Sequence, residues 1–104
     1  MEQHKPLILI TNDDGIDAPG IHELVNYVKE MGDIVVIAPD APHSGQSSAI
    51  SVNKVLQITA HPDYNGAKMY SINGTPVDCV KLGIHAIVPR RPDLLLSGIN
   101  HGSN

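Results

Sequence analysis

Two adjacent aspartates, Asp13 and Asp14, are the residues in this sequence whose type and spacing most directly suggest chemistry. They follow a short apolar run, residues 7–10, and stand directly before Gly15. Neighbouring carboxylates repel each other unless a positive charge lies between them. In an extended strand they would point to opposite faces, so both reach one point only if the chain turns, which Gly15 makes easy. The pair therefore suggests a bound cation.

Two further loops carry oxygen donors that could complete such a site. One is the Pro- and Ser-rich stretch 39–48, and the other is the stretch 97–104 behind a third aliphatic run. In an open parallel α/β sheet, ligands bind beyond the carboxyl ends of the strands, so these loops should meet at one edge. Carboxylate, hydroxyl and amide oxygens suit Mg²⁺, Mn²⁺ or Ca²⁺ better than Zn²⁺. The predicted ligands of one divalent cation are Asp13, Asp14, Ser44 and Asn100.

The elements that must position these residues begin with a strand–helix–strand unit. Residues 7–11 read as a buried strand, and Pro19 is well placed to begin a helix. Apolar residues then recur at helical spacing, and Gly32 is the expected stop. Residues 34–38 form the second strand, which a right-handed crossover places parallel to the first. The apolar stripe of this helix is Ile21, Leu24, Val25, Val28 and Met31.

The second half of the chain predicts a hairpin, a helix and a third parallel strand. Residues 55–60 and 67–72 flank the turn-rich stretch 61–66 and read as antiparallel strands attached to the parallel core. A capping box then starts a helix, with Thr75 as the cap, Pro76 first and Asp78 completing it. Residues 94–96 form the third strand. The buried stripe predicted for this helix is Val77, Val80, Ile84 and Ile87.

Composition bounds the class of protein. The 104 residues fit one domain, spanning 1–104, with 41% hydrophobic residues but no Phe or Trp, so the core must be aliphatic. A net charge of −4 argues against nucleic acid as a partner. No segment resembles a signal peptide or membrane span, and the single cysteine excludes an internal disulfide. These features predict a cytoplasmic α/β protein.

Several polar residues are better read as structural. Cys79 is expected to be a small core residue, and His4, His22, His61 and His85 to be surface or packing residues. His43 and His101 neighbour the predicted ligands, where substrate contact and a solvated loop position are both open. Arg90 and Arg91 are expected to lie in a solvated linker.

Four blocks of this sequence together resemble the SurE family of survival-protein nucleotidases. They are "ILITNDDGIDAPGI", "VVIAPDAPHSGQSSAIS", "INGTPVDCVKLGI" and "LLLSGINHGSN", in this order, and they cover essentially the whole chain. The resemblance implies a Rossmann-like three-layer sandwich with a mostly parallel sheet and an attached hairpin. Family members are usually more than twice this long, so the chain is expected to be the N-terminal portion of a longer protein that assembles as a dimer or tetramer.

The resemblance also implies an activity. The family consists of divalent-metal-dependent phosphatases that release phosphate from nucleoside monophosphates, in the manner of a 5′-nucleotidase. Its metal ligands fall on the four residues predicted above, and Gly45 and Asn104 fall in blocks around the phosphate. Asp13 is expected to hold the metal and to orient or deprotonate the attacking water, while Ser44 is a ligand without an evident base to make it a nucleophile.

Two other readings of the acidic pair remain open from the sequence. A phosphatase of the haloacid dehalogenase type would use an aspartate nucleophile, but it needs two aspartates separated by one residue. A receiver-like signalling module also binds Mg²⁺ through an acidic pair, with Asp40 as a weak candidate for phosphorylation. An inactive metal-binding fragment is the third alternative.

Overall fold

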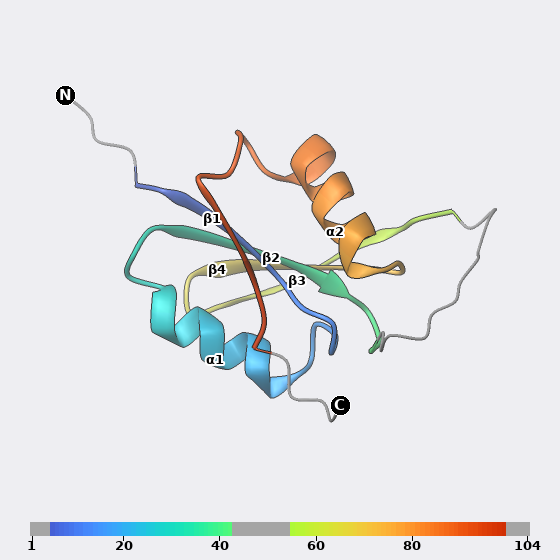
Figure 1. Ribbon diagram of the computed structural model, residues 1–104, viewed down its shortest axis with the longest axis horizontal. Coiled ribbons are helices and arrows are strands. Elements are labelled where there is room, and N and C mark those ends of the chain that lie inside the picture. The colour runs from blue at the N-terminus through green and yellow to red at the C-terminus, as the bar shows by residue number, and fades with distance from the viewer. Residues whose placement is uncertain (1–4, 43–54, 100–104) are drawn as a thin grey trace.

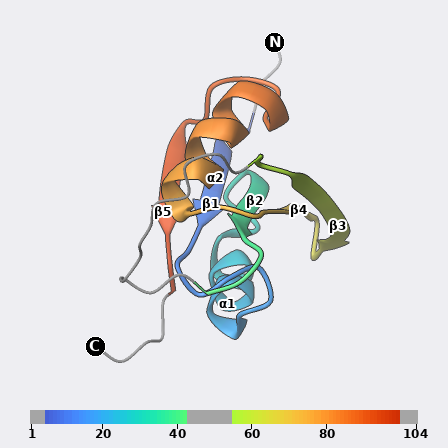
Figure 2. The same ribbon diagram turned by 90° about the vertical axis from the view of Figure 1, so that its right-hand side faces the viewer.

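The computed structural model describes residues 5–42 and 55–99. It contains one sheet in the order β3-β4-β2-β1-β5. The pairs β1–β2, β1–β5 and β2–β4 are parallel, and β3 is antiparallel to β4. Viewed from its end in Figure 2, the sheet separates the two helices, which gives the expected three layers. The strands are β1 (Leu7–Thr11), β2 (Asp33–Pro39), β3 (Ile58–Tyr64), β4 (Ala67–Ile72) and β5 (Leu94–Ser97).

The connections place one helix on each face of the sheet (Figure 1). Helix α1 (Pro19–Val28) joins β1 to β2, while helix α2 (Pro76–Leu82) and the π-helical turn η1 (Gly83–Ile87) lead from β4 back to β5. The parallel strands therefore follow the Rossmann order and not the flavodoxin-like order of receivers. Because the two connections leave in opposite directions, the topological switch point lies between β1 and β5. In the described residues, no helix has the length and apolar character needed to cross a membrane.

Aliphatic side chains on the two faces of the sheet form two separate cores. Strand residues alternate between faces, so Ile8 and Ile10 pack toward α1, while Leu7 and Leu9 pack toward α2. β1 and β2 are buried along nearly their whole length, as expected of central parallel strands. This rigid pair fixes where the loops behind β1 and β2 begin.

Helix α1 ends earlier than the apolar pattern predicts. Its last residue is Val28, and Met31, which belongs to the predicted stripe, is 56% exposed in the turn that follows. Gly32 does not cap the helix. It is buried beside Pro6, and a Cβ there would overlap the Pro6 carbonyl oxygen. The glycine is thus required by the close approach of two chain segments.

The hairpin is tighter than predicted and belongs to the core of the sheet. Tyr64 pairs directly with Ala67, so the connection has two residues, Asn65 and Gly66, with φ angles of 50° and 89°. Positive φ at both positions is typical of a type I′ turn. The stretch 61–64 is therefore strand and not turn, and Pro62 is tolerated because β3 lies at the edge. β4 is not an appendage, because it pairs parallel with β2.

Helix α2 begins as predicted, but only part of its predicted stripe is buried. The Thr75 hydroxyl accepts a hydrogen bond from the Asp78 backbone N–H, and the Asp78 carboxylate accepts one from the Thr75 N–H, which completes the capping box. Two residues of the predicted stripe, Val77 and Ile84, are 60% and 45% exposed, so this part of the prediction is wrong, whereas Ile87 packs against the core on this face. The fully buried positions are Cys79 on α2 and Gly83 at the start of η1, and a Cβ at Gly83 would overlap the Ile37 side chain. The helix lies too close to β2 for large side chains between them.

Candidate functional site at the carboxyl edge of the sheet

The loop behind β1 is shaped by a buried asparagine. The Asn12 side chain is fully buried; its amide donates to the Gly15 carbonyl at 3.0 Å, and its Oδ1 accepts from the Gly15 N–H at 3.1 Å. This reciprocal pair closes a short loop around Asp13, which is exposed, and Asp14, which is half-buried. Asn12 is a positioning residue that the sequence reading missed. An asparagine followed three positions later by glycine is the turn signal that could have indicated it.

A second contact ties this loop to the end of β2. Gly15 has a φ of +105°, which L side chains rarely adopt, and the next N–H, of Ile16, donates to the Pro39 carbonyl at 2.8 Å. A Cβ at Gly15 would lie 3.4 Å from the carbonyl carbon of Ala41. The exits of β1 and β2 are therefore in direct contact.

The exit of β5 meets the same loop from the other side. Thr11 is the register partner of Ser97, and the Gly98 N–H donates to the Thr11 carbonyl at 2.9 Å. The Ile99 N–H then donates to the Gly20 carbonyl at 3.4 Å, in the first turn of α1. The chain thus runs alongside the acidic loop as far as Ile99. Within the described residues, all three strand exits converge at one edge, as the sequence analysis expects.

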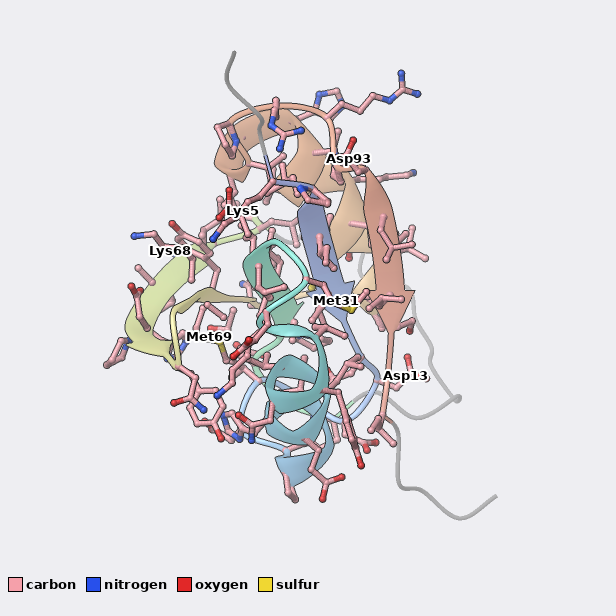
Figure 3. The ribbon with its side chains drawn as sticks, turned by 90° about the vertical axis from the view of Figure 1, so that its left-hand side faces the viewer. Lys5, Asp13, Met31, Lys68, Met69 and Asp93 are labelled. Atoms are coloured by element: carbon pink, nitrogen blue, oxygen red, sulfur yellow. The ribbon has the colours of Figure 1, made fainter. Side chains whose placement is uncertain are left out.

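The predicted site residues are only partly placed. Asp13 lies at the carboxyl end of β1 in Figure 3, and Asp14 follows it in the loop that Asn12 closes. Ser44, Gly45, Asn100 and Asn104 lie outside the described residues, as do His4, His43 and His101. In the sequence, Ser44 follows two positions after the described Pro42, and Asn100 follows directly after the described Ile99. The convergence is thus observed for the strand ends, while the complete ligand set stays a prediction.

The donors in the acidic loop fit a hard cation. In residues 5–42 and 55–99 there is no group of three or more His, Cys, Asp or Glu side chains that could hold a metal. Two carboxylates completed by hydroxyl and amide oxygens would match Mg²⁺, Mn²⁺ or Ca²⁺. The described residues contain only the two carboxylates of this set, so the class of ion stays a prediction.

Cys79 on helix α2 is a core residue, as predicted. Its side chain is fully buried, and burial, together with the negative charges of Asp78 and Asp40, raises the pKa of the thiol from 9.0 to about 12. The thiol is therefore protonated at neutral pH. A nucleophilic cysteine needs a lowered pKa, so Cys79 is unsuited to that role.

The described histidines are packing or surface residues, as expected. His22 on α1 stacks at a tilt against Tyr64, with 4.5 Å between ring centroids. His61 Nε2 lies 2.7 Å from the Ser71 hydroxyl oxygen, but Ser71 is only 3% exposed, so the pair links β3 to β4 and offers no accessible nucleophile. His85 is exposed in η1.

Arg90 differs from the expected solvated linker. Its guanidinium donates to the Asp93 carboxylate at 3.0 Å and to the Lys5 carbonyl at 2.7 Å. The Asp93 carboxylate in turn accepts from the Leu7 N–H at 2.8 Å. These bonds fasten the segment before β5 to the start of β1, at the amino edge of the sheet.

Comparison with known proteins identifies the chain's relatives. The family model described as "Survival protein SurE" matches residues 8–104. The 5′-nucleotidase SurE of Christiangramia forsetii is 54% identical over 107 residues, which covers 100% of this chain and 41% of that protein. The 5′-nucleotidase SurE of Flavobacterium johnsoniae is 52% identical over 105 residues, covering 100% and 40%. The chain thus spans about two fifths of the length of the curated relatives it matches.

A solved structure supports the same relationship. The crystal structure of the SurE protein from Aquifex aeolicus superposes with a TM-score of 0.79 at 40% sequence identity. The match covers 95% of this chain and 39% of that one. The sheet and its two helical layers therefore have a close counterpart of known structure.

Proposed function

The chain belongs to the SurE family, and from this we propose that its protein is a phosphatase that hydrolyses nucleoside 5′- and 3′-monophosphates to nucleoside and phosphate. The names of the relatives support the 5′-nucleotidase part of this proposal. The observation that carries it is the acidic loop, in which Asn12 and Gly15 fix Asp13 and Asp14 where three strand exits converge. Ligands of open α/β sheets bind at this edge, at the switch point between β1 and β5.

The proposed cofactor is one divalent cation, Mg²⁺, Mn²⁺ or Ca²⁺. When bound, such an ion would supply positive charge against a phosphoryl group and relieve the repulsion between the two carboxylates. Phosphoryl transfer depends mainly on positioning and on charge stabilisation, so a hard cation suits this reaction. The residues proposed to hold it are Asp13, Asp14, Ser44 and Asn100.

The chain's own residues would divide the remaining work. Asp13, the exposed member of the pair, would accept a proton from the attacking water and orient it toward phosphorus. Asp14 would complete the anionic half of the site. Ser44 would act as a ligand, and Gly45 and Asn104 would contact the phosphate oxygens through N–H groups. Asn12 would act only by positioning the loop.

The assembly and location of the whole protein are part of the same proposal. We place it in the cytoplasm as a homodimer or tetramer, with nucleoside monophosphates as substrate and neither a membrane nor polymeric nucleic acid as its main partner. The net charge of −4 supports the last point, because an acidic surface repels a phosphate backbone.

The proposal is tested by following phosphate release from AMP. We expect activity with Mg²⁺, Mn²⁺ or Ca²⁺, its loss after treatment with EDTA, and its return when the ion is restored. Asp13→Asn should abolish both activity and binding of Mn²⁺ measured by calorimetry. Asp17→Asn is the matched control, because Asp17 is also exposed and lies in the same connection before α1. Undiminished activity after exhaustive EDTA treatment would contradict the proposal.

A further inference from the structure

A cavity of about 470 Å³ lies at the amino edge of the sheet, at the end opposite to the acidic loop. Its wall is formed by the starts of β1 and β2, the end of α1, the hairpin turn and the segment behind η1. Figure 3 shows Lys5 and Lys68 on this side of the molecule and Asp13 at the far end of β1. The volume falls in the range of roughly 300–1,000 Å³ that is typical of small-molecule sites.

The cavity collects positive charge in an acidic chain. The chain has 7 Lys and Arg against 11 Asp and Glu, yet Asp33 is the only carboxylate among the residues that line the cavity. The convergence of cations from separate elements raises the local potential for an anion. The basic residues in the wall are Lys5, Lys29, Lys68 and Arg90.

These cations differ in how far they are already engaged. Arg90 is bonded to Asp93 and to the Lys5 carbonyl, and Lys68 Nζ lies 3.7 Å from an Asp63 carboxylate oxygen in a mostly exposed pair. Lys5 and Lys29 have no ion pair with any described residue. Lys5 and Lys29 could therefore pair with an anion in the cavity without first breaking an ion pair with a carboxylate.

The remaining wall of the cavity is apolar and includes an aromatic ring. Tyr70 on β4 is half-buried and packs toward the α2 face, and Ile87 and Pro89 close the cavity from the end of η1. An aromatic ring beside aliphatic groups can stack against a planar heterocycle. The cavity thus combines a charged part with a part suited to a base.

We infer that this cavity binds a nucleoside di- or triphosphate, at a site separate from the acidic loop. Its phosphates would lie among Lys5, Lys29 and Lys68, and its base against Tyr70. A single phosphate would leave most of the positive charge unused, and an inorganic anion would leave the apolar wall without a partner. The inference does not depend on the proposed phosphatase activity, because it rests on the opposite edge of the sheet.

The test is calorimetric titration of the protein with ATP in excess EDTA, so that no divalent ion can hold a nucleotide at the acidic loop. We expect saturable binding with a stoichiometry of one, weakened by added salt because exposed charges are screened. Adenosine has the base without the phosphates, and tripolyphosphate has the phosphates without the base, so both should bind more weakly than ATP. Absence of ATP binding, or tripolyphosphate binding as tightly as ATP, would overturn the inference.

Matched variants locate the site. Lys29→Gln and Lys5→Gln should each weaken ATP binding about tenfold, the loss expected for one charged hydrogen bond. Lys81→Gln is the control, because Lys81 is an exposed lysine on α2 outside the cavity. Asp13→Asn should leave ATP affinity in EDTA unchanged while removing Mn²⁺ binding. Equal losses for the lysine variants and the control would overturn the inference as well.

Discussion

The two edges of one parallel sheet are built differently in this chain. At the carboxyl edge, Asn12 turns the chain back on itself and leaves Asp13 and Asp14 on a loop held between neighbouring strand exits. At the amino edge, the bonded side chains of Asp93 and Arg90 also hydrogen-bond to the backbone at the start of β1, and so hold two chain segments together. One edge thus uses its carboxylates to present oxygen atoms, and the other uses a carboxylate and a guanidinium as fasteners.

The charges around the edges follow the same division. Negative side chains collect where the strands end, and both Asp40 and Asp78 contribute to the raised pKa of the nearby Cys79 thiol. Positive side chains collect where the strands begin, around the cavity that Lys5 and Lys29 line. A cation and an anion should therefore be attracted to opposite ends of the molecule, and perturbations at one end should leave the other intact.

The largest expected effect breaks the carboxyl edge alone. Asp14→Asn removes one of two adjacent charges and should lower kcat/KM for AMP by about 10³-fold, or roughly 4 kcal/mol of transition-state stabilisation. Lys29→Gln, at the other edge, should leave this value unchanged. Both are measured by phosphate release under saturating Mg²⁺. A comparable loss in Lys29→Gln would show that the two edges are not independent.

The next largest effect concerns the glycine at each edge. Gly32→Ala should lower the free energy of unfolding by about 2–3 kcal/mol, because its Cβ would overlap the Pro6 carbonyl oxygen. Gly15→Ala should have a smaller effect, about 1–2 kcal/mol, because its positive φ is strained but its nearest contact is 3.4 Å. Urea denaturation measures both.

Metal affinity then distinguishes the two glycine variants. Gly15→Ala should weaken binding of Mn²⁺, because Gly15 shapes the acidic loop, whereas Gly32→Ala should not once the protein is folded. Calorimetry at a temperature where both variants are native provides the comparison. If only Gly32→Ala weakened metal binding, the metal site could not be assigned to the carboxyl edge.

The central strands and the start of α2 could be predicted from the sequence because local signals dominate there. Residues 7–11 and 34–38 are aliphatic runs that only a buried parallel strand accommodates, and β1 and β2 contain them. The capping box at Thr75 depends on residues three positions apart and forms as expected. Convergence of the strand exits follows from parallel pairing alone, so the edge that bears Asp13 was also predictable.

The remaining features depend on long-range packing. The apolar period of α2 did not reveal which face is buried, because the close approach of Gly83 to Ile37 selects the side with small residues. Met31 continues the period of α1, but the chain must leave the helix so that Gly32 can meet Pro6. The bond from Arg90 to the Lys5 carbonyl joins groups that only the tertiary fold brings together, whereas the Asn12–Gly15 pair is local and could have been indicated by its spacing.

A further prediction uses Cys79 as a probe of the acidic edge. Its pKa is raised from 9.0 to about 12 in the folded state, so the unfolded chain loses this proton first as the pH rises. The contribution of the Cys79 thiol to the free energy of unfolding is therefore fully present below pH 9, and it declines as the pH rises from 9 to about 12. By pH 10 the loss relative to pH 8 should be roughly 1.4 kcal/mol.

The control for this prediction is Cys79→Ala, which removes the group while leaving every other titration in place. The difference in unfolding free energy between the two proteins should shrink from pH 8 to pH 10, as measured by urea denaturation. Asp40→Asn should reduce the shift, because the Asp40 charge raises the pKa of the thiol. A pH-independent difference would show that the thiol is not buried from solvent as described.

The smallest expected effect concerns the fastening at the amino edge. Arg90→Gln removes the guanidinium that bonds both Asp93 and the Lys5 carbonyl, but the Arg90 side chain is 41% exposed, so solvent weakens the ion pair. The free energy of unfolding should fall by only about 0.5 kcal/mol.

Arg91→Gln is the matched control, because Arg91 is exposed and has no ion pair within the described residues. Equal effects of the two variants would mean that the bonds of Arg90 add nothing to stability. A change in AMP hydrolysis in Arg90→Gln alone would instead show that the amino edge helps to position the acidic loop through β1.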